Sequence, residues 1–185
     1  MFSYIDNFYE PNDLGLVIIN FLNINFRPSH QSQLNWYGGD RMKAYPCYES
    51  NVLEKQEHPM CPYTIFKNTF EKKTKLKLIN FKTYFRKTKK IELENSKSWR
   101  QCKPHKDEKE YNIAGLIYFN SNSLKDGTYF YTSEHDYEPT AKIGSLYNRC
   151  VFYNSQIPHC PSMEQTVEER WIQPFFLKTE EHNET

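Results

Sequence analysis

Apolar and polar positions change their spacing along the chain, and the change falls near residue 98. In the first part, an apolar run over 14–26 follows Pro11-Asn12-Asp13, a combination that predicts a helix of about three turns. Residues 1–10 are typical of a short strand or extended arm, and 27–46 lack a clear period, which predicts loop. Helical elements are therefore expected near the N-terminus.

Two further patterns occupy residues 50–93. Residues 50–76 are compatible with two helical pieces, because His58-Pro59 and Cys61-Pro62 interrupt them. The next stretch, KLKLINFKTYFRKTKKIEL, alternates apolar and basic side chains. Alternation predicts a half-buried strand, and a break in its phase near Asn80 predicts a β-bulge.

The second part of the chain consists of short apolar runs separated by turn residues. This texture predicts a mainly β fold with N-terminal helices, built around a jelly-roll barrel. We expect one domain over 1–185, in which 1–90 supply helical support and the first strands, 98–178 the barrel and 179–185 a polar tail. The six predicted β runs are 98–107, 111–120, 127–133, 143–147, 149–154 and 168–178.

Composition limits the compartment and the partners. The 24 Lys and Arg residues nearly cancel the 23 Asp and Glu residues, so no strong overall field attracts nucleic acid or an anionic membrane. Five cysteines without a C-x-x-C pair favour a reducing compartment. The longest apolar run, LGLVIINFLNINF, is interrupted by Asn and is too short to span a bilayer. We expect a soluble, cytoplasmic protein without a membrane partner.

Candidate chemistry lies at the start of the second part, in QCKPHKDEKEYNIAGLIYFN. On a strand, His105 and Asp107 share one face, about 6.6 Å apart at their Cα atoms. His159, between Pro158 and Pro161, offers a third ligand in a stiffened loop. Two imidazoles and a carboxylate are the facial triad of non-haem iron, which leaves open coordination positions. H-x-D alone is a weak signal, so the prediction of a metal site depends on the motifs around it.

The motifs around H-x-D come in a fixed order. In chain order they are HKD at 105–107, YFN at 118–120, DGTYF at 126–130, KIGSLYNRCVFYN at 142–154, PHC at 158–160 and Arg170. With these motifs the stretch 98–178 resembles the 2-oxoglutarate and iron(II)-dependent dioxygenase superfamily, specifically its small prolyl-4-hydroxylase-like branch.

The resemblance implies a double-stranded β-helix (jelly-roll, cupin-like) barrel and a site at its mouth. It implies His105, Asp107 and His159 as iron(II) ligands, and Arg170, with Tyr118, as partners of the distal carboxylate of 2-oxoglutarate. The implied activity is a hydroxylase that consumes O2 and oxidises a C–H bond. Its substrate would be a protein side chain such as proline, a nucleobase or a small molecule.

The sequence departs from this family at one place. Many relatives carry Ser or Thr shortly after the Arg, whereas Ile172 and Pro174 follow Arg170 here. The pattern therefore lacks a second polar side chain that would bind the cosubstrate. Arg149 is the backup candidate for binding the cosubstrate. An oxygenase that has lost turnover is consistent with this departure.

Other interpretations stay open. Cys102, His105 and Cys160 would suit a zinc site only in part, because one C-x-x-H pair is half the usual spacing. The barrel could be a binding module without catalysis. The stretch 67–90 holds ten Lys or Arg and a single acid, so it is either a nucleic-acid-binding face or a solvated lysine face. The remaining histidines, which lack partners at ligand spacing, are His30, His58, His135 and His182.

Overall fold

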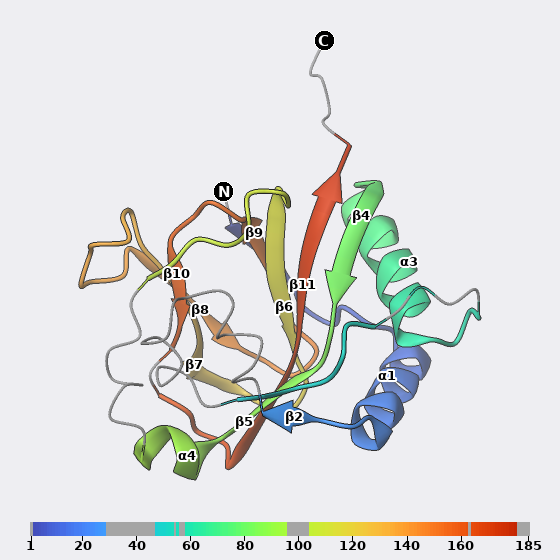
Figure 1. Cartoon of the computed structure of the whole chain (residues 1–185), viewed down its shortest axis with the longest axis horizontal. Coiled ribbons are helices and arrows are strands. Elements are labelled where there is room, and N and C mark those ends of the chain that lie inside the picture. Colours follow the sequence, from blue (N-terminus) through green and yellow to red (C-terminus); the bar gives the residue numbers. More distant parts are fainter. Residues whose placement is uncertain are drawn as a thin grey trace.

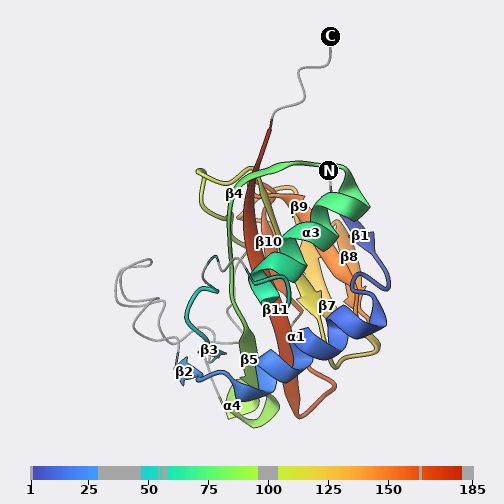
Figure 2. The same ribbon diagram turned by 90° about the vertical axis from the view of Figure 1, so that its right-hand side faces the viewer.

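Two antiparallel sheets face each other, and two helices cover the outer face of the larger one (Figures 1 and 2). This computed structural model describes residues 2–28, 47–53, 55, 58–95, 104–162 and 164–180. Its elements are β1 (Phe2–Ile5), α1 (Pro11–Asn23), β2 (Arg27–Pro28), β3 (Tyr48–Glu49), α3 (Pro62–Thr74), β4 (Leu78–Thr83), β5 (Arg86–Lys89), α4 (Lys90–Asn95), β6 (Ile113–Tyr118), β7 (Ser123–Phe130), β8 (Ala141–Ser145), β9 (Cys150–Asn154), β10 (His159–Pro161) and β11 (Glu169–Thr179).

The C-terminal strand β11 lies in the middle of the larger sheet. That sheet runs β1-β9-β6-β11-β5-β3-β2, with β4 also paired to β11, and the smaller sheet runs β10-β7-β8. Between β4 and β5 the ladder is interrupted opposite Pro174, whose carbonyl accepts hydrogen bonds from the Tyr84 backbone N–H at 3.3 Å and the Thr83 hydroxyl at 2.9 Å. Proline has no N–H to donate, which suits it to such an irregular position.

Alternation along the strands separates two cores. Side chains on the helix-covered face of the larger sheet, including Ile117, Phe175 and Leu177, pack with α1 and α3. Side chains on its other face, including Val151, Tyr153 and Ile172, pack against the smaller sheet. The second core is the inside of the barrel, and the candidate ligands lie at its edge.

Several sequence predictions are confirmed. The first helix begins at Pro11, and the second of the two expected helical pieces is α3, which Cys61 caps by accepting from the Thr64 N–H. The bulge near Asn80 is present: Asn80 pairs with Lys178 and Leu78 with Thr179, which leaves Ile79 as the extra residue.

Other predictions are wrong. Residues 50–53 are not helical, because the Ser50 and Leu53 backbone N–H groups donate to Phe85 at 2.9 Å and Thr83 at 2.8 Å. A strand was expected over 98–107, but residues 104–107 form no strand and make only a single β-bridge, at His105. The expected loop around His159 is the strand β10.

Some predictions fall outside the described residues. These are the loop over 29–46, residues 98–103 of the first β run, and 181–185 of the tail; within the described part, Arg27–Pro28 form β2 and Thr179 ends β11. In the part of the chain that the structure describes, no helix is long and apolar enough to cross a membrane.

Candidate metal centre

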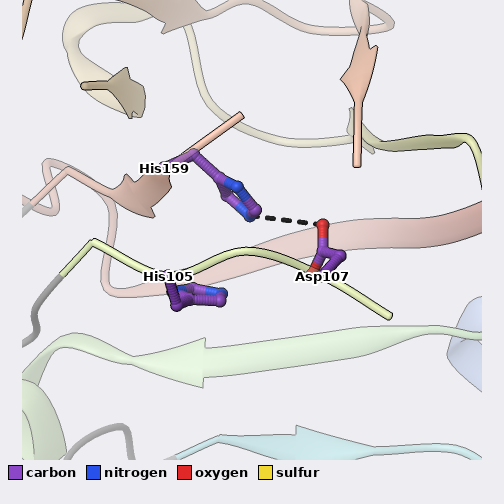
Figure 3. A group of neighbouring side chains, drawn as sticks. All are labelled: His105, Asp107 and His159. Carbon is purple, nitrogen blue, oxygen red and sulfur yellow. Dashed lines mark ion pairs between the residues drawn. The ribbon is translucent and has the colours of Figure 1, made fainter. Parts of the chain in front are cut away.

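Backbone pairing brings the two candidate imidazoles together. His105 and His159 form an isolated antiparallel bridge in which each backbone N–H donates to the other residue's carbonyl at 3.0 Å. Residues directly opposite each other in such a pair have Cα atoms about 5.5 Å apart. Asp107 follows two residues later on the same strand-like segment, and Figure 3 shows its carboxylate close to the His159 ring.

The three side chains converge closely enough to share one cation. One ligand atom from each of His105, Asp107 and His159 lies within 4.8 Å of the others. His159 Nε2 is 3.4 Å from Asp107 Oδ2, the contact dashed in Figure 3. Asp107 Oδ2 is buried without a hydrogen-bond partner among the described residues. A buried carboxylate oxygen left over beside two imidazoles fits a divalent cation, because a metal would satisfy it.

Hydrogen bonding and burial set the protonation of His159. Its Nδ1 lies 3.0 Å from the Ile157 carbonyl, which can only accept, so the ring proton sits on Nδ1 and Nε2 presents its lone pair to Asp107. Burial lowers the pKa of His159 to about 4. The ring is therefore neutral at physiological pH, the form that ligates metals.

The same burial acts in the opposite direction on Asp107. It raises the pKa of that carboxyl to about 6, against the opposing effect of the nearby positive charges of His105, Arg86 and Lys82. A carboxylate whose charge is poorly compensated by the protein alone gains from a bound cation. Electrostatics and geometry therefore indicate the same occupant.

Backbone contacts hold the ligand segment in place. The Asp107 backbone N–H donates to Ser155 at 2.9 Å, and the Gln156 side chain donates to the Asp107 carbonyl at 3.2 Å. The Tyr153 ring lies 4.5 Å from the His159 ring, between centroids, and closes its other side. These contacts fix the segment although it has little regular strand structure.

Sequence reasoning missed three side chains near the triad. The side chains of Lys82, Tyr84 and Arg86 lie on one face of the segment formed by β4, β5 and the two residues between them. They alternate with side chains buried on the opposite face, which are Phe81, Thr83 and Phe85.

Electrostatic contacts place this row beside the ligand segment. Arg86 donates to the Tyr84 hydroxyl at 2.8 Å and to Glu49 at 2.5 Å. Burial raises the pKa of Tyr84, and the charge of Asp107 adds to this effect more weakly. The alternation of apolar and basic residues in the sequence predicted which side chains share a face, but it did not predict which face lies beside the site.

The predicted cosubstrate residues lie deeper in the barrel. Arg170 is 2% exposed, and its Nη1 lies 3.9 Å from Asp126 Oδ1 across the two sheets. Tyr118 makes a parallel contact, its hydroxyl 3.0 Å from the Thr128 hydroxyl. Along β7, Asp126 and Thr128 precede Phe130, which pairs with His159. About 13 Å of strand therefore separates the Arg170 end of the barrel from the metal centre.

The backup arginine is engaged elsewhere. Arg149 donates to both carboxylate oxygens of Asp6, at 2.5 and 2.9 Å, and to the Gly144 carbonyl at 3.0 Å. A guanidinium committed to a resident carboxylate and a carbonyl is a poor candidate for a second anion.

The zinc alternative receives no support from the described residues. Cys160 does not join the group of ligand atoms, and its thiol instead lies 3.3 Å from the Tyr131 hydroxyl. Cys102 lies outside the described residues.

Comparison with known proteins identifies the fold. No family model matches the chain, and no curated protein matches it in sequence. Among solved structures, a prolyl-4-hydroxylase from Pseudomonas putida matches 96% of this chain and 92% of its own at a TM-score of 0.58 and 11% identity.

Two further structures agree with this match. An oxidoreductase of the 2OG-Fe(II) oxygenase family from Burkholderia pseudomallei matches 96% of this chain and 84% of its own, with a TM-score of 0.59 and 9% identity. HygX from Streptomyces hygroscopicus, with nickel and 2-oxoglutarate bound, matches 95% and 82%, with a TM-score of 0.56 and 10% identity. The predicted double-stranded β-helix fold is confirmed.

Proposed function

We propose that this protein is an iron(II)- and 2-oxoglutarate-dependent oxygenase. The observation that carries the proposal is that one ligand atom from each of His105, Asp107 and His159 lies within 4.8 Å of the others, while Asp107 Oδ2 is buried without a hydrogen-bond partner in the described part of the chain. This donor set belongs to non-haem iron(II) oxygenases, and it lies in the fold that such enzymes share. Fold and ligand set are independent observations that support the same chemistry.

Each proposed residue has a distinct task. His105, Asp107 and His159 would hold iron(II) on one side and leave the opposite positions open. Bound iron(II), with 2-oxoglutarate and O2, supplies the oxidation that yields succinate, carbon dioxide and a hydroxylated C–H bond. Arg170 would anchor the distal carboxylate of 2-oxoglutarate, and the Tyr118 hydroxyl would assist it. Val151, Ile172 and Phe130 belong to the buried apolar cluster inside the barrel, which would help to keep water out of the site.

For the substrate we propose a protein side chain, with proline as the first choice. The match to a bacterial prolyl-4-hydroxylase over most of both chains supports this choice. The same fold also serves other chemistry, since the non-heme α-ketoglutarate-dependent epimerase SnoN, from nogalamycin biosynthesis, matches this chain as well. A nucleobase or small molecule is the alternative that a substrate screen would reveal. A reducing, intracellular location accords with Cys150 and Cys160, which are free thiols.

The deciding experiment is an anaerobic titration of the purified protein with iron(II) and 2-oxoglutarate. A visible metal-to-ligand charge-transfer band is expected in the wild type. His159→Ala should abolish it, because the metal loses a ligand whose Nε2 faces Asp107. His135→Ala is the matched control, because His135 is an exposed histidine outside the ligand group, and this variant should keep the band.

Two results would count against the proposal in different ways. A folded wild-type protein without the band would rule out the oxygenase and favour a binding module. A band without succinate formation in air, across a panel of peptides, nucleosides and small molecules, would indicate an oxygenase that has lost turnover.

A further inference from the structure

The Arg170 end of the barrel already contains an acidic residue. Asp126 is fully buried on β7, and its Oδ1 faces Arg170 Nη1 at 3.9 Å. This distance is too long for a hydrogen bond but short enough for strong charge compensation in a buried setting. A buried arginine without a counter-charge would be costly, so Asp126 explains how the protein tolerates Arg170 before any ligand binds.

Asp126 is held in place from its other side. Its Oδ2 accepts hydrogen bonds from the Thr166 hydroxyl at 2.6 Å, the Thr166 backbone N–H at 2.9 Å and the Ser121 hydroxyl at 3.1 Å. The Ser121 hydroxyl in turn lies 2.6 Å from that of Ser145. Three donors on one oxygen keep the carboxylate where it is, so it cannot swing away when another anion approaches Arg170.

The remaining oxygen has no such anchor. Asp126 Oδ1 is buried and lacks a hydrogen-bond partner among the described residues. The Asp126 carboxylate therefore compensates the charge of Arg170 from 3.9 Å and does not form a short bidentate contact with the guanidinium. The Asp6–Arg149 pair shows the contrast, because there both carboxylate oxygens accept from the guanidinium, at 2.5 and 2.9 Å.

We propose that Asp126 is a specificity-determining residue for the cosubstrate, because it offsets the charge of Arg170 and weakens the preference of the site for a dicarboxylate. This inference rests on the proposed function, in which Arg170 receives the distal carboxylate of 2-oxoglutarate. That carboxylate must bind beside a fixed anion, so the repulsion cancels much of the attraction. A 2-oxo acid without the distal carboxylate would not meet this repulsion.

The test compares two cosubstrates in the metal-loaded protein. Dissociation constants for 2-oxoglutarate and 2-oxovalerate are measured by calorimetry, anaerobically and with manganese(II) bound. In Asp126→Asn, 2-oxoglutarate should bind about tenfold more tightly than in the wild type, because a negative charge near the guanidinium has gone. The affinity for 2-oxovalerate should stay within twofold. Asp6→Asn, which removes the carboxylate of the other Arg–Asp pair, should change neither value.

Failures of the two proposals give different results. If manganese-loaded wild type binds neither 2-oxo acid, the proposed function fails. If it binds both but Asp126→Asn leaves 2-oxoglutarate unchanged or weaker, or shifts both acids equally, the role of Asp126 fails. If the variant does not fold, the two dissociation constants of the wild type decide. A preference for 2-oxoglutarate over 2-oxovalerate below about tenfold supports the proposal, and a larger preference contradicts it.

Discussion

At the scale of single residues, burial changes which of the proposed ligands competes with protons when a metal binds. An unperturbed histidine would have to lose a proton near pH 6.5 before it could bind a metal. Burial lowers the pKa of His159 to about 4, so this ring is already neutral throughout the physiological range. Burial raises the pKa of Asp107 to about 6. The carboxylate, which the sequence alone would treat as always ionised, therefore also competes with protons for the metal.

The first prediction concerns the pH dependence of metal binding. Below pH 6 the metal-free carboxyl of Asp107 holds a proton that the cation must displace. Cobalt(II) affinity should therefore be level from pH 8 to 7 and fall by up to about tenfold per pH unit below 6. His159 should contribute only near pH 4. A titration followed by the cobalt absorption bands measures this, and a constant affinity from pH 8 to 5 would contradict it.

The second prediction separates the two candidate arginines. Arg170→Gln should weaken 2-oxoglutarate binding at least about tenfold, since a charge-assisted pair inside a protein contributes about 1.5–3 kcal/mol per hydrogen bond. Metal affinity should not change, because Arg170 is not among the ligand atoms. Arg149→Gln should lower thermal stability by breaking the contact with Asp6 but leave 2-oxoglutarate affinity as it was. The reverse pattern would transfer the cosubstrate role to Arg149.

Residue types and order were enough to predict which three side chains converge, but not their neighbours. His105, Asp107 and His159 stand in a motif order that the sequence displays directly. The counter-charge Asp126 lies inside the quoted DGTYF motif, yet its role depends on a contact across two sheets that spacing along one strand cannot reveal. The same holds for Arg86, which reaches the site only because β5 pairs with β11.

At the scale of elements, β7 depends on a glycine that no other residue can replace. Gly127 has φ +146°, and a Cβ there would lie 2.1 Å from the Ile143 carbonyl oxygen. It stands between Asp126 and Thr128, the two residues of β7 that face Arg170 and Tyr118. The end of the barrel proposed to bind the cosubstrate therefore relies on this backbone conformation.

The third prediction follows from that geometry. Gly127→Ala should lower the free energy of unfolding by about 2 kcal/mol or more, through strain and close contact with β8. Gly15→Ala is a matched control in α1, where a Cβ meets nothing within 4 Å, and it should raise stability by about 0.5–1 kcal/mol. Urea denaturation measures both. Equal effects at the two sites would refute the assigned role of Gly127.

Elements with strong local signals were predictable and those defined by pairing were not. Helix α1 has Pro at its first position and an apolar stripe, and the bulge at Ile79 shows as a break in alternation. Residues 50–53 carry no signal that distinguishes a helix from an extended segment bound to Thr83 and Phe85. Strand β10 has three residues, two of them buried, too few for a period to appear.

At the scale of the whole molecule, the basic stretch 67–90 is largely neutralised by acids from elsewhere in the fold. The one acidic residue of the stretch, Glu71, pairs with Lys67. Acids outside the stretch supply the pairs Lys73–Glu10, Lys82–Glu108, Arg86–Glu49, Lys87–Glu169 and Lys89–Glu92. Paired charges release few counterions, so this face is poorly suited to a polyanion.

The fourth prediction is weak, unspecific binding of nucleic acid. Fluorescence anisotropy with a labelled single-stranded oligonucleotide should give a Kd above about 100 µM near 150 mM salt, at the weak end of non-specific binding. Glu108→Gln, which removes the acid beside Lys82, should tighten binding slightly at low salt. Micromolar affinity with a steep salt dependence would instead restore the nucleic-acid interpretation.

The overall architecture was predictable because its motifs come in a fixed order. Six ordered pieces over 98–178 indicated the barrel, and the match to oxygenase structures over nearly the whole chain confirms the fold. The pairing of β4 and β5 with β11 was not predictable, because residues about ninety positions apart form it. One domain over 1–185 stays a prediction.

The central position of β11 also affects how the protein is made. A ribosome synthesises this strand after all the others described, yet β11 joins β6 on one side to β4 and β5 on the other. Until it emerges, β1-β9-β6 and β5-β3-β2 are unconnected parts with open strand edges, β4 lacks the strand it pairs with, and the core still lacks Phe175 and Leu177. Such edges are the usual sites of misassembly. Nascent chains that stall before residue 169 should therefore depend on chaperones, although they already carry all three proposed metal ligands.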